Sequence, residues 1–162
     1  MKKIKTSAGI ILFRTGNDIN NDLQVLLVHP GGPFWAKKDL GVWSIPKGEI
    51  AGGENMLDAA RRELKEETGI EVDGSFIALS PVKLKSGKII YAWAIKYDFE
   101  IINITSNTFE MEWPPKSGKI KNFLEIDKAD WFMMDQVQIK LNPGQLPLIC
   151  ELIQKLFNYP RF

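Results

Sequence analysis

Three glutamates, Glu63, Glu66 and Glu67, lie close together in the segment 48–70, which reads GEIAGGENMLDAARRELKEETGI. A helix places residues at these offsets within an arc of roughly 100°, so the three carboxylates share one side. The apolar residues of the segment form a separate stripe that can pack against a core, made up of Leu57, Ala60 and Leu64. Carboxylates at this spacing repel one another by roughly a few tenths of a kcal/mol per pair, and a nearby cation removes that repulsion. Because the ligand atoms are all oxygens, we expect Mg²⁺ or Mn²⁺ rather than zinc.

The chemistry that suits this cluster is hydrolysis of a phosphoanhydride. Carboxylates repel a polyphosphate substrate unless divalent cations stand between the two, and such cations also lower the pKa of a bound water. A nearby carboxylate can then accept the proton. Other chemistries have little support, because the chain has one histidine, His29, and lacks a nucleophile elbow, a dinucleotide-binding glycine motif and a P-loop. We expect His29 to be a loop residue near the pocket mouth and not a catalyst.

The segment 48–70 resembles the Nudix box, a family pattern of nine fixed positions within twenty-three residues. Every fixed position is met, by Gly48, Glu54, Arg62, Glu63, Leu64, Glu66, Glu67, Gly69 and Ile70. The resemblance implies the α+β Nudix fold, an α/β/α sandwich with a mixed β-sheet, in a single domain over residues 1–162. It also implies hydrolysis of a nucleoside diphosphate that is linked to another moiety.

The resemblance further implies a metal site with particular ligands. These are the backbone carbonyl oxygen of Lys47 and the carboxylates of Glu66 and Glu67, with Glu63 as either a further ligand or the general base. Glu63 and Glu66 are therefore the candidate catalytic residues, although the base differs among Nudix enzymes and need not lie in the box. Metal ligands need neighbours that fix their orientation. The residues expected to brace them are Gly48, Glu54 and Arg62.

A further metal ligand is expected outside the box. In many Nudix hydrolases a glutamate lies a few residues before a strand whose aromatic residue packs into the core. Glu125, six residues before Trp131, matches that pattern best. Glu110 and Glu112 are the alternatives, and a site without such a ligand is another.

Candidate substrate-binding residues lie in three places. The loop 29–41 contains Trp35 and Lys37, an aromatic and cationic mixture suited to a base and its phosphates; its aromatic residues could equally fold back onto the core. The side chain of Lys47 is free to meet phosphate. Tyr91 belongs to a strand with alternating aromatic residues and could reach a cleft, although aromatic residues at this period are more often core.

The segment 103–122 is polar and long for a connection, and Pro114 and Pro115 interrupt it. We predict a loop here, which is either a flap that faces phosphate or a solvated basic loop. The lysines that could serve such a flap are Lys116, Lys119 and Lys121.

The rest of the pattern predicts the elements that position the site. Strands are expected over 6–14, 23–29, 42–46, 75–80 and 89–100, with a polar surface turn over 16–21. The box helix should end at Gly69. Two helices should follow Met134, and the second should pack on the core with Cys150 buried. We expect the box helix on one face of the sheet and the C-terminal helix on the other.

Composition limits the partners. With 21 basic and 20 acidic residues the net charge is near zero, so we expect a small nucleotide substrate, and a nucleic acid is not expected. The apolar run 8–13 is too short for a signal peptide or a membrane span. We therefore expect a cytoplasmic protein with no membrane partner, and the single cysteine suits a reducing compartment. Exposed Trp and Phe side chains leave a homodimer as an alternative assembly.

The lead-in to the box, WSIPKG at 43–48, resembles the diadenosine polyphosphate hydrolase branch and its diphosphoinositol relatives. We rank a dinucleoside polyphosphate first as substrate, a nucleoside triphosphate second, and capped RNA or a nucleotide sugar lower. The alternative from another class is a Nudix-fold module that senses a nucleotide without hydrolysing it. Such modules typically lose box carboxylates, and this chain retains them all.

Overall fold

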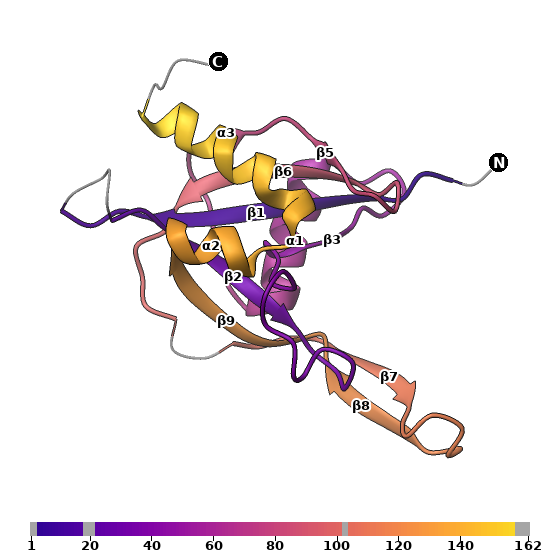
Figure 1. Ribbon diagram of the computed structural model, residues 1–162. Coiled ribbons are helices and arrows are strands. Elements are labelled where there is room, and N and C mark those ends of the chain that lie inside the picture. Colours follow the sequence, from indigo (N-terminus) through magenta and orange to yellow (C-terminus); the bar gives the residue numbers. More distant parts are fainter. Residues whose placement is uncertain (1–2, 18–21, 102–103, 158–162) are drawn as a thin grey trace.

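A mixed β-sheet is the central layer of the protein, seen in a computed structural model that describes residues 3–17, 22–101 and 104–157 (Figure 1). The strand order is β4-β6-β1-β2-β9, with β3 paired to β1 and β5 paired to β6. Strands β1 and β6 run parallel, whereas β1 runs antiparallel to β2 and β3. The strands of this sheet are β1 (Thr6–Arg14), β2 (Gln24–Pro30), β3 (Lys47–Glu49), β4 (Ile77–Ala78), β5 (Val82–Lys83), β6 (Ile89–Lys96) and β9 (Ile126–Met133).

Helices cover both faces of the sheet, so the predicted α/β/α sandwich is confirmed. In β1, alternate side chains point to opposite faces: Ile10 and Leu12 pack with the first helix, and Ile11 and Phe13 pack with the last. The sheet therefore lies between two apolar cores, which share β1. The helical elements are α1 (Met56–Thr68), α2 (Met134–Lys140), the 3₁₀ helix η1 (Pro143–Gln145) and α3 (Leu146–Phe157).

The segment before the box differs from its prediction. Residues 42–46 form two isolated bridges, Val28 with Ser44 and Trp43 with Leu141, and the strand begins only at Lys47. The bridges still tie this segment to β2 and to the C-terminal part of the chain. Of the predicted turn over 16–21, residues 18–21 lie outside the described part of the chain.

The prediction of a loop over 103–122 is wrong for most of that segment. It forms a separate hairpin of β7 (Thr108–Glu112) and β8 (Ile120–Leu124). The hairpin projects from the sandwich beside the loop that follows β2 (Figure 1). Part of the signal is present in the sequence, because apolar side chains alternate with polar ones on β7, as a ribbon with one packed face requires, although β8 lacks this alternation. Residues 102 and 103 are not described.

Helix α3 packs as predicted, but the predicted burial of Cys150 is wrong. The buried side of the helix is formed by Leu148, Ile149 and Leu152, and Cys150 is exposed. The apolar neighbours of Cys150 in the sequence favour burial. The 3.6-residue period of the helix instead turns its side chain away from the sheet. Among the described residues, no helix is both long and apolar enough to cross a membrane.

Candidate active site on the box helix

Helix α1 has defined ends, which hold its glutamates in register with the sheet. The side chain of Asn55 accepts hydrogen bonds from the backbone N–H groups of Leu57 (3.0 Å) and Asp58 (3.2 Å), which helix starts otherwise leave unpaired. At the other end Gly69 has φ of 80° and donates to the carbonyl of Lys65 (2.7 Å). The predicted C-terminal cap is therefore confirmed.

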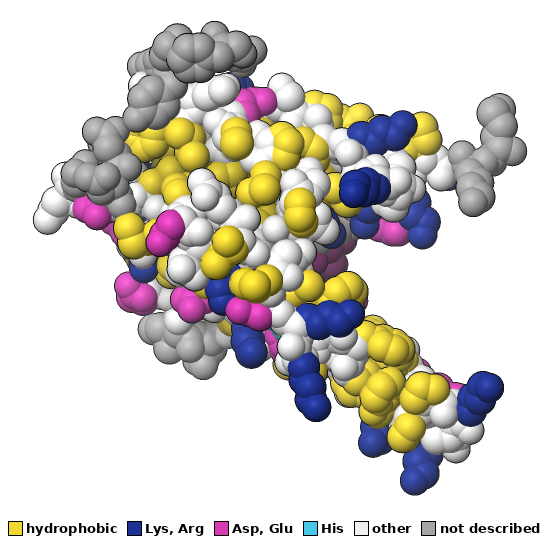
Figure 2. All heavy atoms as spheres, in the orientation of Figure 1, with side chains coloured by type: hydrophobic (Ala, Val, Ile, Leu, Met, Phe, Trp, Pro, Cys, Tyr) yellow, Lys and Arg dark blue, Asp and Glu magenta, His cyan; other side chains and the backbone are white. Residues whose placement is uncertain are grey.

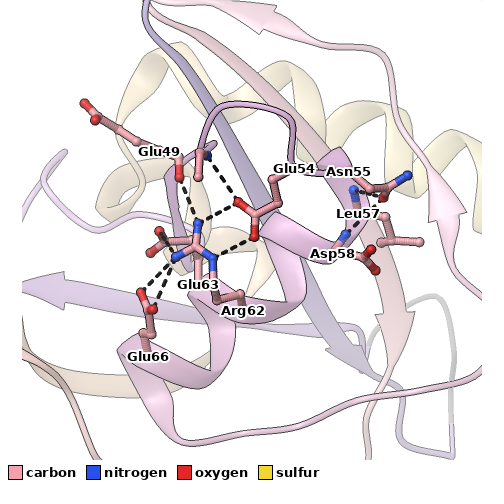
Figure 3. Close-up of polar contacts among 9 residues, drawn as sticks. Glu49, Glu54, Asn55, Leu57, Asp58, Arg62, Glu63 and Glu66 are labelled. Carbon is pink, nitrogen blue, oxygen red and sulfur yellow. Dashed lines mark hydrogen bonds and ion pairs between the residues drawn. The ribbon is translucent and has the colours of Figure 1, made fainter.

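The guanidinium group of Arg62 contacts several carboxylates on the outer side of α1 (Figure 3). Its Nε and Nη2 donate to the two carboxylate oxygens of Glu54 at 2.8 and 3.0 Å. Its Nη1 donates to Oε1 of Glu63 at 2.9 Å and to Oε2 of Glu66 at 3.1 Å. Nη2 also reaches the carbonyl oxygen of Glu49 at 3.1 Å. One guanidinium thus links three box carboxylates to the end of β3.

Gly48 leaves the space that the carboxylate of Glu63 occupies. A Cβ at position 48 would lie 2.0 Å from Cδ and Oε2 of Glu63. Any side chain there would displace this carboxylate. The structural reason for glycine at this position is therefore close approach between β3 and α1.

A pocket of about 310 Å³ opens beside the other edge of α1. It brings together four residues from the predicted site: Trp35, Lys47, Glu67 and Glu125. The backbone N–H of Lys47 donates to Oε2 of Glu67 at 3.1 Å, which joins β3 to α1 at the pocket wall. The remaining lining residues are Val28, Pro30, Val42, Ser44, Ile126, Asn142 and Gln145.

Burial and mutual repulsion shift the pKa values of the glutamates in this region. Burial raises the pKa of Glu67 to about 8, and the charges of Glu63 and Glu125 add to the rise. Burial likewise raises the pKa of Glu63, with additions from Glu66 and Glu125. Burial lowers the pKa of Lys47, although Glu67 and Glu63 oppose this shift. Burial, with a smaller addition from neighbouring carboxylates, therefore disfavours the charged forms of Glu63 and Glu67.

A hard divalent cation fits this donor set. All candidate ligands are oxygens, the preferred ligands of Mg²⁺ and Mn²⁺, and the raised pKa values of Glu63 and Glu67 show that added positive charge would be favourable. In the arrangement that the described residues adopt, no three His, Cys, Asp or Glu side chains converge on one point. Instead, Nη1 of Arg62 holds Glu63 and Glu66. Arg62 therefore occupies one oxygen of Glu63 and contacts both oxygens of Glu66.

The other predicted site residues are dispersed. Lys37 is exposed and is not among the residues that line the pocket. Tyr91 is half-buried on β6, paired with Ala8, and also lies outside the pocket lining. Glu110 and Glu112 lie on the projecting hairpin and are not among the residues that line the pocket, whereas Glu125 lines it. Of the three alternatives for the ligand outside the box, the structure places Glu125 near Glu67.

The expectation that His29 is a loop residue is wrong. It lies in β2 and is 1% exposed. Its Nε2 donates to the carbonyl oxygen of Lys38 (2.6 Å), and its Nδ1 lies 2.7 Å from Oδ1 of Asp127. The ring thus ties the loop after β2 to β9. A single histidine at the end of an apolar run gave no indication of these two partners.

Gln145 is a pocket residue that sequence reasoning missed. It is 1% exposed, its Oε1 accepts from the backbone N–H of Ile45 (3.0 Å), and its Nε2 donates to Oγ of Ser44 (3.0 Å). It therefore fixes the segment that leads into the box from a point 100 residues away. The sequence signal was the Asn-Pro-Gly turn before it, where the side chain of Asn142 accepts from the N–H of Gly144, but the partner could not be read from the sequence.

Residues 3–152 match the family model described as the NUDIX domain. The chain belongs to the Nudix family. Nudix hydrolase 5 of Arabidopsis thaliana is 29% identical over 119 residues, which are 73% of this chain and 34% of that protein. The asymmetrical bis(5'-nucleosyl)-tetraphosphatase of Rattus norvegicus is 33% identical over 107 residues, which are 59% of this chain and 69% of that enzyme. The chain spans about a third of the length of the plant Nudix protein.

Solved Nudix structures share the fold. The NUDIX domain of NrtR from Shewanella oneidensis, solved in complex with ADP ribose, aligns with a TM-score of 0.67 at 20% identity, over 96% of this chain and 90% of that one. The likeness agrees with an α+β Nudix fold that has a mixed sheet and helices on both faces. The segment 48–70 is therefore a Nudix box on α1 and on the loop that precedes it.

Proposed function

We propose that residues 1–162 act as a single Nudix hydrolase domain that cleaves a phosphoanhydride bond in a nucleoside diphosphate linked to another moiety. The observation that carries this proposal is the pocket itself. Glu67 and Glu125 line it together with Lys47 and Trp35, so anionic ligands for a cation lie beside a cationic and an aromatic group. A polyphosphate joined to a base has the chemistry that matches these groups.

Each residue has a proposed role. The carboxylates of Glu66, Glu67 and Glu125 and the carbonyl oxygen of Lys47 would hold Mg²⁺ or Mn²⁺, with Glu63 as a further ligand or as the base. The bound cation would supply neutralisation of charge on the phosphates and a more acidic water. As the base, Glu63 would accept the proton from the attacking water. The ammonium group of Lys47 and the ring of Trp35 bind phosphate and base, and Gly48, Glu54 and Arg62 position the box.

We rank the substrates by the similarity of the chain to asymmetrical bis(5'-nucleosyl)-tetraphosphatases. A dinucleoside polyphosphate is our first candidate, and a nucleoside triphosphate is the second. The experiment is turnover of diadenosine tetraphosphate, deoxynucleoside triphosphates, ADP-ribose and a capped dinucleotide, each with Mg²⁺ and with EDTA. Metal-dependent cleavage of one compound is the expected result. Binding without cleavage of any compound would contradict hydrolysis and favour a nucleotide-sensing module.

A further inference from the structure

The pocket lies at the small end of the range for ligand sites. Pockets for small ligands range over roughly 300–1,000 Å³, and this one has a volume of about 310 Å³. A pocket of this volume suits one nucleotide better than two. If the substrate carries a second nucleotide, that part must lie on the surface outside the pocket.

The β7–β8 hairpin carries its opposite charges on opposite faces. Residues opposite each other in an antiparallel pair point to the same face, and the register pairs Phe109 with Phe123 and Met111 with Lys121. The pairing continues beyond β7, since the N–H of Trp113 donates to the carbonyl of Lys119 at 2.9 Å. One face therefore holds aromatic and basic side chains. The other face holds the hairpin's two carboxylates, on Glu110 and Glu112.

The loop after β2 connects the basic face of the hairpin to the pocket. Gly31 donates its N–H to the carbonyl of Glu125 at 2.8 Å, and a Cβ on Gly31 would lie 1.9 Å from the carbonyl oxygen of Leu124. Further along the loop, the rings of Phe34 and Trp113 meet edge to face at 5.5 Å. The next residue, Trp35, lines the pocket. An aromatic path thus runs from the pocket onto the hairpin.

Lysine side chains lie along this path. Nζ of Lys38 lies 5.1 Å from the ring centroid of Trp35, and Lys119 and Lys121 are exposed on the hairpin. Phe34 is 56% exposed. The nearby carboxylate of Asp39 is already paired with Lys140 at 2.6 Å. Hydrophobic and basic side chains lie together along the projecting hairpin (Figure 2).

We propose that this basic-aromatic strip, composed of Phe34, Trp35, Lys38, Trp113, Lys119 and Lys121, binds a second nucleotide joined to the polyphosphate in the pocket. Aromatic rings stack on bases of any sequence, and lysines attract phosphates. The carboxylates of Glu110 and Glu112 lie on the opposite face of the hairpin from such a ligand. The inference rests on the proposed function, and it specifies that the moiety linked to the reactive nucleoside diphosphate is itself a nucleotide.

Two sources could supply that nucleotide: a dinucleoside polyphosphate, or the 5' end of a short RNA. The experiment measures kcat/KM with Mg²⁺ for diadenosine tetraphosphate, for a 5'-triphosphorylated trinucleotide and for ATP. The variant Lys119→Ala/Lys121→Ala is compared with Lys83→Ala/Lys85→Ala, which removes two exposed lysines at β5 and the turn that follows it. A second variant, Phe34→Ala, tests stacking separately from charge.

The expected result is that the ratio of kcat/KM for the better two-nucleotide substrate to that for ATP falls about tenfold in Lys119→Ala/Lys121→Ala and in Phe34→Ala. The ratio should stay within about twofold in the Lys83→Ala/Lys85→Ala control, because charge away from the strip contributes little. The substrate whose ratio falls identifies the source.

An unchanged ratio in both strip variants, with ATP still cleaved, would overturn the strip and leave the proposed hydrolysis intact. An unchanged ratio together with a dimeric wild type that Phe34→Ala converts to a monomer would assign the strip to self-association instead. Cleavage of none of the three substrates by the wild type would overturn the strip, and it would refute the proposed hydrolysis itself only if ADP-ribose and the capped dinucleotide were also left uncleaved.

Discussion

The backbone N–H of Lys47 lies 3.1 Å from Oε2 of Glu67 and donates a hydrogen bond to it. This bond holds the only pocket-lining glutamate of the described part of α1 against β3. It also explains how a carboxylate whose pKa is raised by burial keeps a fixed orientation. The same contact makes several properties of the site testable.

Glu67→Gln should abolish most activity and leave the fold intact. The amide keeps an oxygen acceptor for the N–H of Lys47 but loses the charge that a cation needs. We expect Mn²⁺ affinity to fall roughly tenfold or more and kcat/KM to fall on the order of 100-fold, as measured by calorimetry and by turnover. Glu71→Gln is the matched control, since Glu71 is exposed just beyond the helix and pairs with Lys65. Equal effects of the two substitutions would contradict a metal role for Glu67.

The stability of the metal-free protein should depend on pH through Glu67. Its pKa is raised by burial from 4.5 in the unfolded chain to about 8 in the folded one, so the folded state binds the proton more tightly. The stability from this proton is full below pH 4.5 and is lost as pH rises through 8. In EDTA, the wild type should therefore lose stability from pH 5 to pH 8 relative to Glu67→Gln. Parallel urea-unfolding curves for the two proteins across this range would disprove the assignment.

Gly48→Ala should reduce activity far more than stability. The new Cβ would fall 2.0 Å from the carboxylate of Glu63, and a flexible side-chain end can move aside at small cost. Displacement of a reacting group by about 1 Å can cost about 100-fold in rate, so we expect kcat/KM to fall on the order of 10–100-fold. Gly52→Ala is the control, because a Cβ there meets nothing within 4 Å. If Gly48→Ala kept kcat/KM within twofold, the close approach of Gly48 to the carboxylate of Glu63 would not matter for catalysis.

His29→Ala should loosen the loop that carries Trp35. The substitution removes a buried ring and its contacts with Lys38 and Asp127, so we expect the free energy of unfolding to fall by about 2–4 kcal/mol. KM should rise because the aromatic wall of the pocket is no longer held to β9. The control is Asp130→Asn, an exposed position on the same strand. Urea unfolding within about 0.5 kcal/mol of wild type would show that the loop is anchored in another way.

The elements that sequence reasoning predicted best are those whose signals are local. β1 is buried on both faces, as its apolar sequence predicts, and the helix of the box stops at Gly69. The spacing of Glu63, Glu66 and Glu67 follows from the helical period alone. The helical period also predicts the C-terminal helix. The predicted burial of Cys150 is wrong because neighbouring apolar residues do not show which side of a helix is buried.

Contacts between segments distant in the chain could be identified only from the tertiary structure. The side chain of Gln145 accepts a hydrogen bond from the backbone N–H of Ile45, and His29 contacts Asp127, which is 98 residues away in the sequence. No local pattern encodes such pairs. The hairpin of β7 and β8 packs one face on the loop after β2, where Phe34 contacts Trp113.

The sequence by itself determined the carboxylate side of the box helix, because helical periodicity acts within a few residues. Its resemblance to the Nudix box predicted the family and the sandwich. Only the tertiary structure decided that Glu125 and not Glu110 lies beside Glu67, and that Arg62 holds Glu63 and Glu66. Those outcomes depend on how separate elements pack. A carboxylate's neighbours in space, and not its neighbours in sequence, set its charge and its partners.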